Sequence, residues 1–376
     1  MSEYDYDIGI LGGGAAGLTV ASGAAQLGAK ALLVEKEPAL GGDCLHYGCV
    51  PSKTLIHSAN VYHLMKSGKQ FGLPEIDVPP VDFSRISNRI QAVINKIQTH
   101  DSEERFCGLG AKVMFGEARF HDEHTIQLDG KHYTAKNWVI ATGSSPMAPP
   151  ISGLHETGFL TNREIFSLDR LPESLTILGG GPIGIEMAQA FNRLGSRVMV
   201  VDRADQILGK EDKDMADAVM GVLAAEGVDF HLGTSIERVV PDGGQKTVTL
   251  TAAAGERKTL SSEEILVAMG RAANVEGLNL ESIGVDFEPS GIFVDSRLRT
   301  SQKHIFAAGV VSGGFHFTHA AGYEGGVVVS NAVFHLPRKT DYTFLPWCTY
   351  TDPELASIGM NETRAKAAGL EYAVWT

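Results

Sequence analysis

The chain has 376 residues, which at about 150 residues per domain suggests two or three domains. Its 45 acidic residues outnumber its 32 Lys and Arg residues, for a net charge of −13 without any basic run, which disfavours nucleic acid and anionic membrane surfaces as partners. There is no stretch of 18 apolar residues and no basic-then-apolar leader, so we expect a cytoplasmic protein without a membrane span. Four cysteines are too few for a structural disulfide framework.

A glycine-rich turn between two apolar segments opens the chain. Residues 6–11 predict a strand, the run Gly12-Gly13-Gly14-Ala15-Ala16-Gly17 starts a helix, and residues 30–34 predict a second strand that ends at Glu35. This strand–GxGxxG–helix–strand–acid order is typical of a dinucleotide site. The glycines let a pyrophosphate approach the helix N-terminus, and Glu35 is placed to accept hydrogen bonds from ribose hydroxyls.

The same arrangement recurs later in the chain. Residues 174–178 predict a strand, Gly179-Gly180-Gly181-Pro182-Ile183-Gly184 starts a helix, and residues 197–201 form a strand that ends at Asp202. The two fingerprints are too far apart for a solenoid repeat. We therefore expect two separate nucleotide-binding domains and two dinucleotides.

The region between the two fingerprints shows helical periodicity over residues 83–109 and hairpin-like strands over residues 121–140. The buried segment Trp138–Ile140 then leads into the small-residue turn Ala141-Thr142-Gly143-Ser144, and the following prolines predict a linker.

Two more apolar strands run into glycine after the second fingerprint. They end at Gly270-Arg271 and at Gly309, and Thr318-His319 opens a helix of small residues that extends to about Val333. The composition changes again at Thr343.

The segment LGGDCLHYGCVPSK, residues 40–53, carries Cys44 and Cys49 in a C-x4-C spacing. This spacing without a second cysteine pair is unusual for zinc, so we expect no metal site. A redox-active disulfide is favoured instead, because a helix start, backbone N–H groups and Lys53 all favour thiolate. Cys107 and Cys348 are isolated, and we interpret them as buried or incidental.

The runs GGGAAG, GGDCLHYGCVPSK and GGGPIGIE together resemble the flavin-dependent pyridine nucleotide–disulfide oxidoreductases over nearly the whole chain. Dihydrolipoamide dehydrogenase and mercuric reductase are the nearest groups, and glutathione reductases, which usually carry PKK where this chain has PSK, are less similar. The resemblance implies an α/β fold with two Rossmann-like, three-layer domains. The expected domains are an FAD-binding domain of residues 1–148 and 273–342, an inserted NAD(P)-binding domain of residues 149–272, and the truncated start of an α+β dimerisation domain in residues 343–376.

The resemblance also implies catalytic roles. Cys49 matches the flavin-proximal, charge-transfer thiol, and Cys44 matches the interchange thiol that attacks a disulfide or receives a metal. Lys53 matches the lysine near flavin N5, and Glu186 matches its ion-pair partner. A cation there stabilises an electron-rich ring, and a buried carboxylate keeps the lysine charged.

The helix at Thr318-His319 matches the family helix that points its N-terminus at the flavin N1/O2 edge; His319 receives no proton-transfer role. The positions expected to contact FAD are Gly12, Gly14, Ala15, Ala16, Gly17, Glu35, Lys36, Gly42, Asp43, Cys44, Cys49, Lys53, Ala118, Ala141, Thr142, Gly143, Ser144, Gly309, Val310, Thr318 and His319. Those expected to contact NAD are Gly179, Gly181, Pro182, Ile183, Gly184, Glu186, Asp202, Arg203, Gly270 and Arg271.

Three features qualify the assignment. Asp202 favours NAD over NADP because it repels a 2′-phosphate, although the adjacent Arg203 is able to turn toward one. Val310 stands where the family has an aspartate that hydrogen-bonds the ribityl chain, a loss of about 1–2 kcal/mol. The segment FLPWCTYTDPELASIG resembles the first strands of the dimerisation domain, whose later His–Glu pair is not in the sequence, so we expect a truncated form of a longer, homodimeric protein.

The expected activity passes electrons between NAD(H), FAD and the Cys44–Cys49 disulfide, with dihydrolipoamide dehydrogenase-like chemistry on a small thiol or disulfide. One alternative is reduction of Hg(II), a soft-metal substrate. The other, from a different class, is a non-catalytic nucleotide-binding fragment, suggested by Val310 and the incomplete last domain.

Overall fold

A computed structural model describes residues 3–253 and 255–375. The chain divides into two compact units. The first comprises residues 1–50, 92–145 and 271–342, and the second comprises residues 51–91, 146–270 and 343–376. Each unit has its own sheet, and we describe them separately.

The first unit is built on a parallel sheet in the order β3-β2-β1-β6, with β18 on the far side of β6. The strands are β1 (Tyr6–Leu11), β2 (Ala31–Glu35), β3 (Lys112–Phe115), β6 (Lys131–Ile140) and β18 (Ile305–Ala307). β2 is buried along its whole length, as expected for a parallel strand with both faces covered, which explains its continuous apolar sequence.

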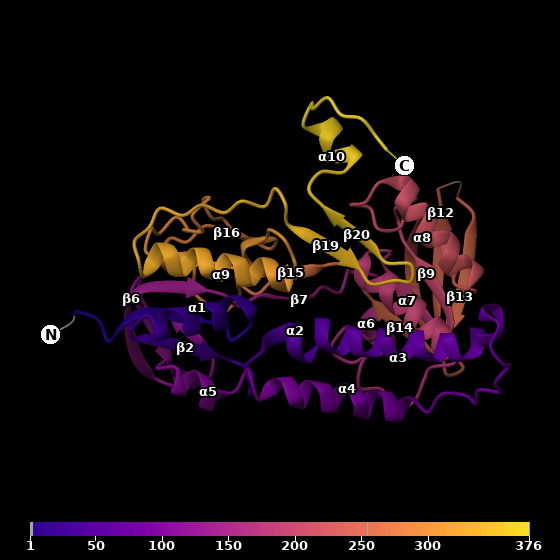
Figure 1. The fold of residues 1–376 in the computed structure, drawn as a ribbon, viewed down its shortest axis with the longest axis horizontal. Helices are drawn as coiled ribbons and strands as arrows, with labels where there is room; N and C mark the ends of the chain where they lie inside the picture. Colours follow the sequence, from indigo (N-terminus) through magenta and orange to yellow (C-terminus); the bar gives the residue numbers. More distant parts are fainter. Residues whose placement is uncertain (1–2, 254, 376) are drawn as a thin grey trace. The chain divides into compact units, whose positions relative to one another are not determined.

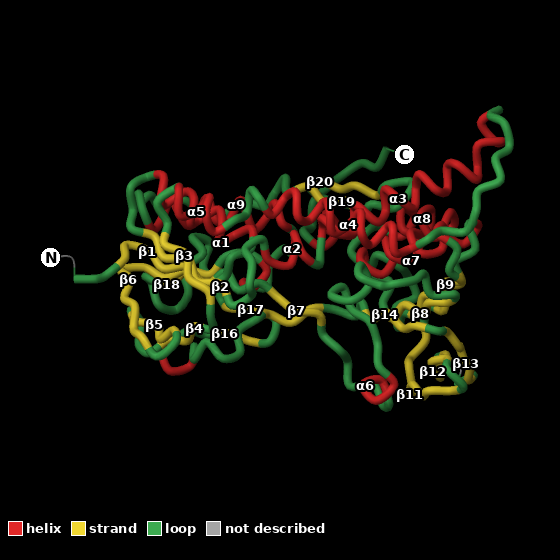
Figure 2. Tube along the Cα trace, turned by 90° about the horizontal axis from the view of Figure 1, so that it is seen from below, coloured by secondary structure: helices red, strands yellow, loops and turns green. Residues whose placement is uncertain are grey.

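Helices cover one face of this sheet, shown red against the yellow strands in Figure 2. They are α1 (Ala15–Gln26), α5 (Glu103–Gly108) and α9 (Thr318–Ala332), and α1 packs along α9 through small residues (Figure 1). The other face is covered by an antiparallel meander of β4 (Ala118–Phe120) and β5 (Thr125–Leu128) with the start of β6, and by residues 275–292. The shorter elements of this unit are α2 (Gly42–His46), β7 (Ser144–Pro146), β15 (Arg271–Ala273), η2 (Glu281–Ile283), β16 (Phe287–Glu288), β17 (Gly291–Ile292) and η3 (Val310–Ser312).

The second unit has a four-stranded parallel sheet in the order β10-β9-β8-β14. Its strands are β8 (Ser174–Leu178), β9 (Arg197–Val201), β10 (Asp229–His231) and β14 (Glu264–Val267). The connection from β8 to β9 is α7 (Pro182–Leu194), and α8 (Lys213–Ala225) leads from β9 to β10. An antiparallel sheet of β11 (Thr234–Asp242), β12 (Gln245–Ala252) and β13 (Arg257–Ser262) packs against the parallel sheet through Leu250 and Leu260.

The remaining elements of the second unit are α3 (Cys49–Ser67), η1 (Gly68–Phe71), α4 (Phe83–Gln98), α6 (Leu154–Thr157), β19 (Pro346–Thr349), β20 (Leu355–Ile358) and α10 (Glu362–Ala367). Two of the boundaries between the units fall within helices, at residues 50/51 in α3 and 91/92 in α4.

The helical segment predicted over residues 83–109 is two helices, α4 and α5. The chain turns at residues 99–102, and Ser102 caps α5 by accepting a hydrogen bond from the backbone N–H of Arg105. Both predicted Rossmann-like sheets are present, so the predicted α/β class is confirmed. Across the described ranges, no helix has the length and apolar character needed to span a bilayer.

Candidate functional site

The first glycine turn connects β1 to α1 in the first unit. Gly12 has a φ of +110°, and a Cβ on Gly17 would lie 1.9 Å from the Gly12 carbonyl oxygen. Glycine is therefore required at both positions, because any side chain would separate helix from strand. Gly14 caps α1, so the first-turn N–H groups of the helix meet no capping side chain from this position.

Glu35, at the end of β2, is buried beside this turn. Its Oε2 accepts a hydrogen bond from the Gly13 N–H at 2.6 Å, and its Oε1 accepts one from the Glu37 N–H at 2.8 Å. The carboxylate is thus fixed by two backbone donors. The next residue in the chain, Lys36, is exposed. This geometry holds a negative charge at the carboxyl end of the sheet, where a ribose is expected.

The second glycine turn, in the second unit, repeats these contacts. Gly179 has a φ of +117°, and a Cβ on Gly184 would lie 2.0 Å from the Gly179 carbonyl oxygen. Asp202 Oδ2 accepts from the Gly180 N–H at 2.6 Å, and Asp202 Oδ1 accepts from the Ala204 N–H at 2.8 Å. Gly181 caps α7, with Pro182 in its first turn, and the Ile183 and Arg203 side chains are exposed.

The predicted redox pair lies in the first unit, where α2 carries Cys44 and α3 begins at Cys49. Both are thiols in the structure, and they hydrogen-bond each other. The Thr318 hydroxyl, in the first turn of α9, lies 3.3 Å from Cys49 Sγ and also hydrogen-bonds Cys44. The tertiary structure therefore brings three predicted site residues, Cys44, Cys49 and Thr318, into contact.

The two sulfurs are not equivalent. The pKa of the Cys44 thiol is raised, first by its hydrogen bond to Cys49 and second by burial, while the bond from Thr318 acts in the opposite direction. The sequence analysis expects the surroundings of the pair to favour thiolate, whereas the pKa of Cys44 is raised. The raised pKa disfavours thiolate at Cys44, because a neighbouring sulfur and partial burial both oppose a charge there.

Arg271 connects other predicted site residues in the first unit. Its Nε donates to Ser144 Oγ and its Nη2 to the Ser144 carbonyl, both at 2.7 Å, and Nη2 lies 3.1 Å from Asp43 Oδ2. We had grouped Arg271 with the NAD positions, but the structure pairs it with two of the expected FAD positions. Asp43 directly precedes Cys44, so this ion pair restrains the helix that carries the thiol.

The other predicted positions of the first unit lie in turns or at the first residues of helices and strands. Thr142 and Asn274 exchange two hydrogen bonds, and the Asn274 N–H donates to the Gly143 carbonyl at 2.9 Å. Ala141 follows β6, Gly42 begins α2 and Ala118 begins β4, while Ala15 and Ala16 lie in the first turn of α1. His319 is exposed and stacks on Phe317. In the second unit, the Gly270 carbonyl accepts from the Met147 N–H.

Val310 lies in a turn that a buried acid organises. The preceding Gly309 has a φ of +79° and donates its N–H to Glu324 Oε2 at 2.6 Å. Glu324 is 1% exposed, and its Oε1 accepts from the Tyr342 hydroxyl at 2.7 Å. Burial raises the pKa of Glu324, while these two bonds oppose the shift. An acid is thus present at this turn, but it binds the Gly309 backbone.

The predicted ion pair forms within the second unit. Lys53 Nζ, on α3, lies 2.6 Å from Glu186 Oε2 on α7. Glu186 is only 6% exposed, whereas the lysine side chain is 35% exposed. The carboxylate therefore holds a cation that still reaches solvent.

Comparison with known proteins identifies the family. The profile described as pyridine nucleotide-disulphide oxidoreductase matches residues 6–325, well over half of the chain. The chain belongs to this family.

Individual relatives agree with the assignment. A Bacillus subtilis (strain 168) dihydrolipoyl dehydrogenase is 37% identical over 97% of this chain and 79% of its own length. A Lysinibacillus sphaericus mercuric reductase is 34% identical over 99% of this chain and 68% of its own length. The structure of RclA, an HOCl-induced flavoprotein disulfide reductase from Escherichia coli, has a TM-score of 0.86 and 30% identity over 97% of this chain and 80% of that one. The predicted family is confirmed.

Pyridine nucleotide-disulphide oxidoreductases use FAD and NAD(P), and the glycine turns of this chain fit both groups. A Cβ on Gly14 would meet only Gly42 Cα, at 3.8 Å, and one on Gly143 or Gly181 would meet no described atom within 4 Å. These backbones are therefore open on the side that a dinucleotide approaches.

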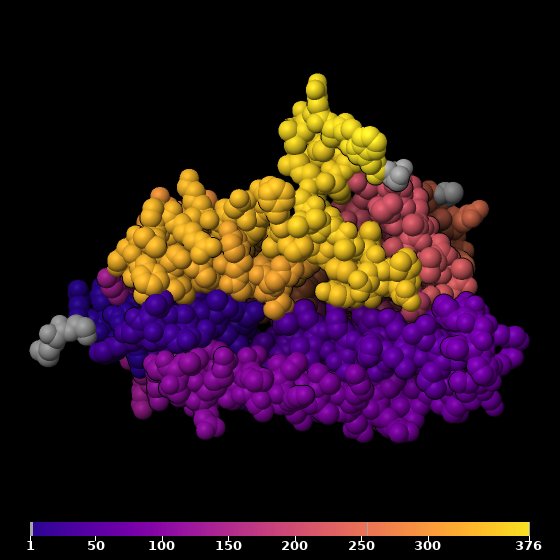
Figure 3. All heavy atoms as spheres, viewed as in Figure 1, coloured from indigo at the N-terminus to yellow at the C-terminus, as the bar shows by residue number. Residues whose placement is uncertain are grey.

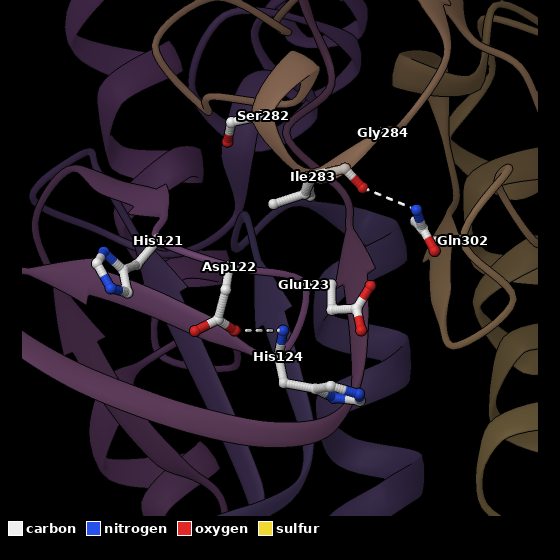
Figure 4. A pocket seen from close by; sticks show the side chains of 8 residues that line it. All are labelled: His121, Asp122, Glu123, His124, Ser282, Ile283, Gly284 and Gln302. Carbon is white, nitrogen blue, oxygen red and sulfur yellow. Dashed lines mark hydrogen bonds between the residues drawn. The ribbon is translucent and has the colours of Figure 1, made fainter.

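A separate pocket in the first unit is lined by His121, Asp122, Glu123, His124, Ser282, Ile283, Gly284 and Gln302 (Figure 4). Its polar groups bond within the protein: Asp122 accepts from the His124 N–H at 2.8 Å, and Gln302 donates to the Ile283 carbonyl at 2.9 Å. The predicted site residues of the family are not among those that line it, and no cluster of three metal-ligating side chains occurs in the described ranges.

Three contacts escaped the sequence reasoning. Thr318 was expected at the cofactor, not at the thiols, and Glu324 and Tyr350 were not singled out. A single acid in a helix of small apolar residues was a usable signal for Glu324. Tyr350 contacts residues far away in sequence, which no local pattern reveals. Cys107 is exposed and Cys348 half-buried.

Proposed function

We propose that this oxidoreductase passes electrons between NAD(H), FAD and the Cys44–Cys49 pair, in dihydrolipoyl dehydrogenase-like chemistry in which a dithiol is the donor and NAD the acceptor. The observation that carries the proposal is the pair of hydrogen-bonded thiols, Cys44 on α2 and Cys49 at the start of α3, beside the Thr318 hydroxyl at the start of α9. Two thiols in contact are the reduced form of a disulfide that opens and closes by two electrons.

FAD belongs, in this proposal, to the first glycine turn with Glu35, and the nicotinamide nucleotide to the second with Asp202. When bound, FAD would supply two-electron transfer between the nicotinamide and the disulfide. The protein supplies open glycine backbones, helix N-termini and fixed carboxylates. Lys53 holds a positive charge for the flavin ring, and Glu186 keeps that charge in place.

NAD is the proposed nicotinamide nucleotide, with NADP disfavoured. Both Asp202 oxygens are anchored by backbone N–H groups, so the carboxylate cannot turn away from an incoming 2′-phosphate. Arg203 is exposed and directly follows Asp202, which makes it the residue to examine if NADPH proves the better donor.

Cys49 is the proposed flavin-proximal thiol and Cys44 the interchange thiol. This division is supported by the raised pKa of Cys44, which disfavours thiolate at Cys44 and has the hydrogen bond with Cys49 as its largest cause. The proton must leave Cys44 before it can attack a disulfide, so interchange requires a base at that step.

The domain assignment also remains a proposal: FAD-binding residues 1–148 and 273–342, NAD-binding residues 149–272 and a dimerisation segment from 343. The limits of the compact units at residues 145, 270 and 342 support it, although residues 51–91 group with the second unit. We propose a homodimer as well. The segment from Thr343, yellow in Figure 3, exposes Phe344, Ile358, Met360 and Trp375.

The test of the thiol roles uses three serine variants. Cys49→Ser should abolish the long-wavelength thiolate–flavin absorbance of the reduced protein, and Cys44→Ser should preserve or enhance it. Cys107→Ser, which changes the exposed cysteine of α5, is the matched control and should leave the spectrum unchanged. Identical spectra for the first two variants would overturn the assignment.

The substrate is decided by assaying the purified protein with NADH against lipoamide, Hg(II) and glutathione disulfide. We expect lipoamide to be reduced fastest. The Hg(II) alternative is kept because mercuric reductases match the chain over almost its full length. A colourless protein that binds nucleotide without turnover would instead support the non-catalytic alternative.

A further inference from the structure

Both carboxylate oxygens of Glu186 have a partner: one pairs with Lys53 and the other accepts a hydrogen bond from Tyr350. Lys53 occupies Oε2, and Glu186 Oε1 accepts a hydrogen bond from the Tyr350 backbone N–H at 2.9 Å. All three residues belong to the second unit. A carboxylate held by two donors on different oxygens has its plane and orientation fixed.

The Tyr350 side chain contacts the same lysine. Lys53 Nζ lies 4.6 Å from the centroid of the Tyr350 ring, within the range of a cation–π interaction. The ammonium group is therefore bound by a carboxylate and by an aromatic face. Since Lys53 is 35% exposed, the ring also replaces part of the water around the charge.

The chain just after Tyr350 is fastened to α7, the helix that carries Glu186. Asp352 and Gln189 exchange two hydrogen bonds of 2.8 Å each, and Arg193 Nη1 donates to Asp352 Oδ2 at 3.0 Å. Glu186, Gln189 and Arg193 follow one another at three- and four-residue spacing and share a helix face.

Arg193 is itself held in place. It is 6% exposed, makes a two-bond ion pair with Glu226 and donates to Asn60 Oδ1 at 2.7 Å. Asn60 lies on α3, the helix that carries Lys53. The same set of residues thus secures the lysine's helix, the glutamate's helix and the segment of Tyr350.

We propose that Tyr350 is a positioning residue for Lys53: its N–H orients Glu186, and its ring holds the ammonium group at the place where the proposed function needs a positive charge. The inference rests on the proposed function. It assigns part of the chemical site to residues 346–352, a segment that the family resemblance of the sequence relates to dimerisation.

The experiment compares Tyr350→Leu with Tyr350→Phe. Leucine removes the ring but keeps the backbone N–H, and phenylalanine keeps both. We expect Tyr350→Leu to lower the rate of flavin reduction at saturating NADH by about three- to fivefold, the size of one partly exposed cation–π contact, with KM unchanged. Tyr350→Phe should restore the rate to within about twofold.

A second readout does not depend on turnover. Acetylation of the purified protein, followed by peptide mass spectrometry, reports the reactivity of each lysine. We expect Lys53 to react severalfold faster in Tyr350→Leu than in the wild type, and Lys66 and Lys69 to be unaffected. In a Lys53→Met background, Tyr350→Leu should cause no further loss of flavin reduction, because the tyrosine acts through the lysine.

Tyr62→Leu is the matched control, because Lys66 lies 5.0 Å from the Tyr62 ring on the same helix but is not paired with Glu186. It should leave flavin reduction unchanged. Equal rates and equal Lys53 labelling in the wild type and Tyr350→Leu would overturn the proposal for Tyr350. A wild type whose flavin NADH does not reduce would instead contradict the proposed function, whatever the labelling shows.

Discussion

The two glycine-turn helices, α1 in the first unit and α7 in the second, share their backbone design, and their side chains at one matching position have different roles. Both begin at a glycine cap. In each, an acid at the end of the next strand, Glu35 or Asp202, accepts a 2.6 Å hydrogen bond from a backbone N–H of the glycine turn. Five residues after the cap, α1 has Thr19, whose hydroxyl bonds back to Ala15, and α7 has Glu186, which binds Lys53 and Tyr350.

This difference shows how one nucleotide scaffold serves two purposes. On α1 this position is Thr19, which forms a hydrogen bond within its own helix, and the proposed function of the turn before it is to bind a nucleotide. On α7 the same position carries a buried charge that connects three segments distant in sequence. In the proposed function the scaffold provides a phosphate site in both units, and the glutamate on the second helix adds a buried charge there.

Making α7 resemble α1 at this position should have the largest effect. Glu186→Thr removes the carboxylate that fixes Lys53, and we expect flavin reduction by NADH to fall about 10²-fold, the usual loss for a positioned electrostatic group. Stopped-flow absorbance measures the rate. Thr19→Ala is the control and should change it little; an unchanged rate in Glu186→Thr would show that the two helices are functionally equivalent.

The acids at the strand ends come next. Asp202→Ala should lower the preference for NADH over NADPH about 10–100-fold, because a charge-assisted hydrogen bond is lost and the repulsion of a 2′-phosphate disappears. The ratio of kcat/KM for the two nucleotides measures it. Glu35→Ala should leave that ratio intact and weaken flavin retention. A wild type that prefers NADPH would contradict the role of Asp202 and direct attention to Arg203.

A smaller effect is expected where the first unit departs from its family. Val310→Asp should raise FAD affinity on the order of tenfold by restoring one hydrogen bond. Retained flavin after dialysis measures the change, and Val310→Asn separates hydrogen bonding from charge. Weaker retention in the aspartate variant would mean that the new acid, next to the Gly309–Glu324 bond, is buried without a partner.

The smallest effect concerns Thr318. Its hydroxyl lowers the pKa of Cys44 against the larger raising effects of Cys49 and burial. Thr318→Val should therefore move the pH profile of Cys44 alkylation by iodoacetamide to higher pH, since the thiolate loses a donor. Peptide mapping separates Cys44 from the other thiols, and Thr19→Val should leave the profile unchanged. A shift to lower pH would contradict the reading of this bond.

Local sequence patterns determined much of this protein. The two glycine turns, the acids at the strand ends and the family were predictable because each depends on residues close together in the chain. The predicted limits of the strands on either side of each glycine turn agree with the structure to within a residue or two, because a buried parallel strand needs a continuous apolar run. The Lys53–Glu186 pair was expected from the family resemblance and is present in the structure.

Only the tertiary structure decided the contacts that join distant segments. The break between α4 and α5, the Arg271–Asp43 pair, the Glu324 bond to Gly309 and the contact of Tyr350 with Glu186 connect residues that no periodicity relates. The raised pKa of Cys44 belongs to this group too, because it depends on which sulfur and which hydroxyl folding brings near the thiol. A local pattern encodes backbone geometry, whereas the electrostatics of a site arise from long-range packing.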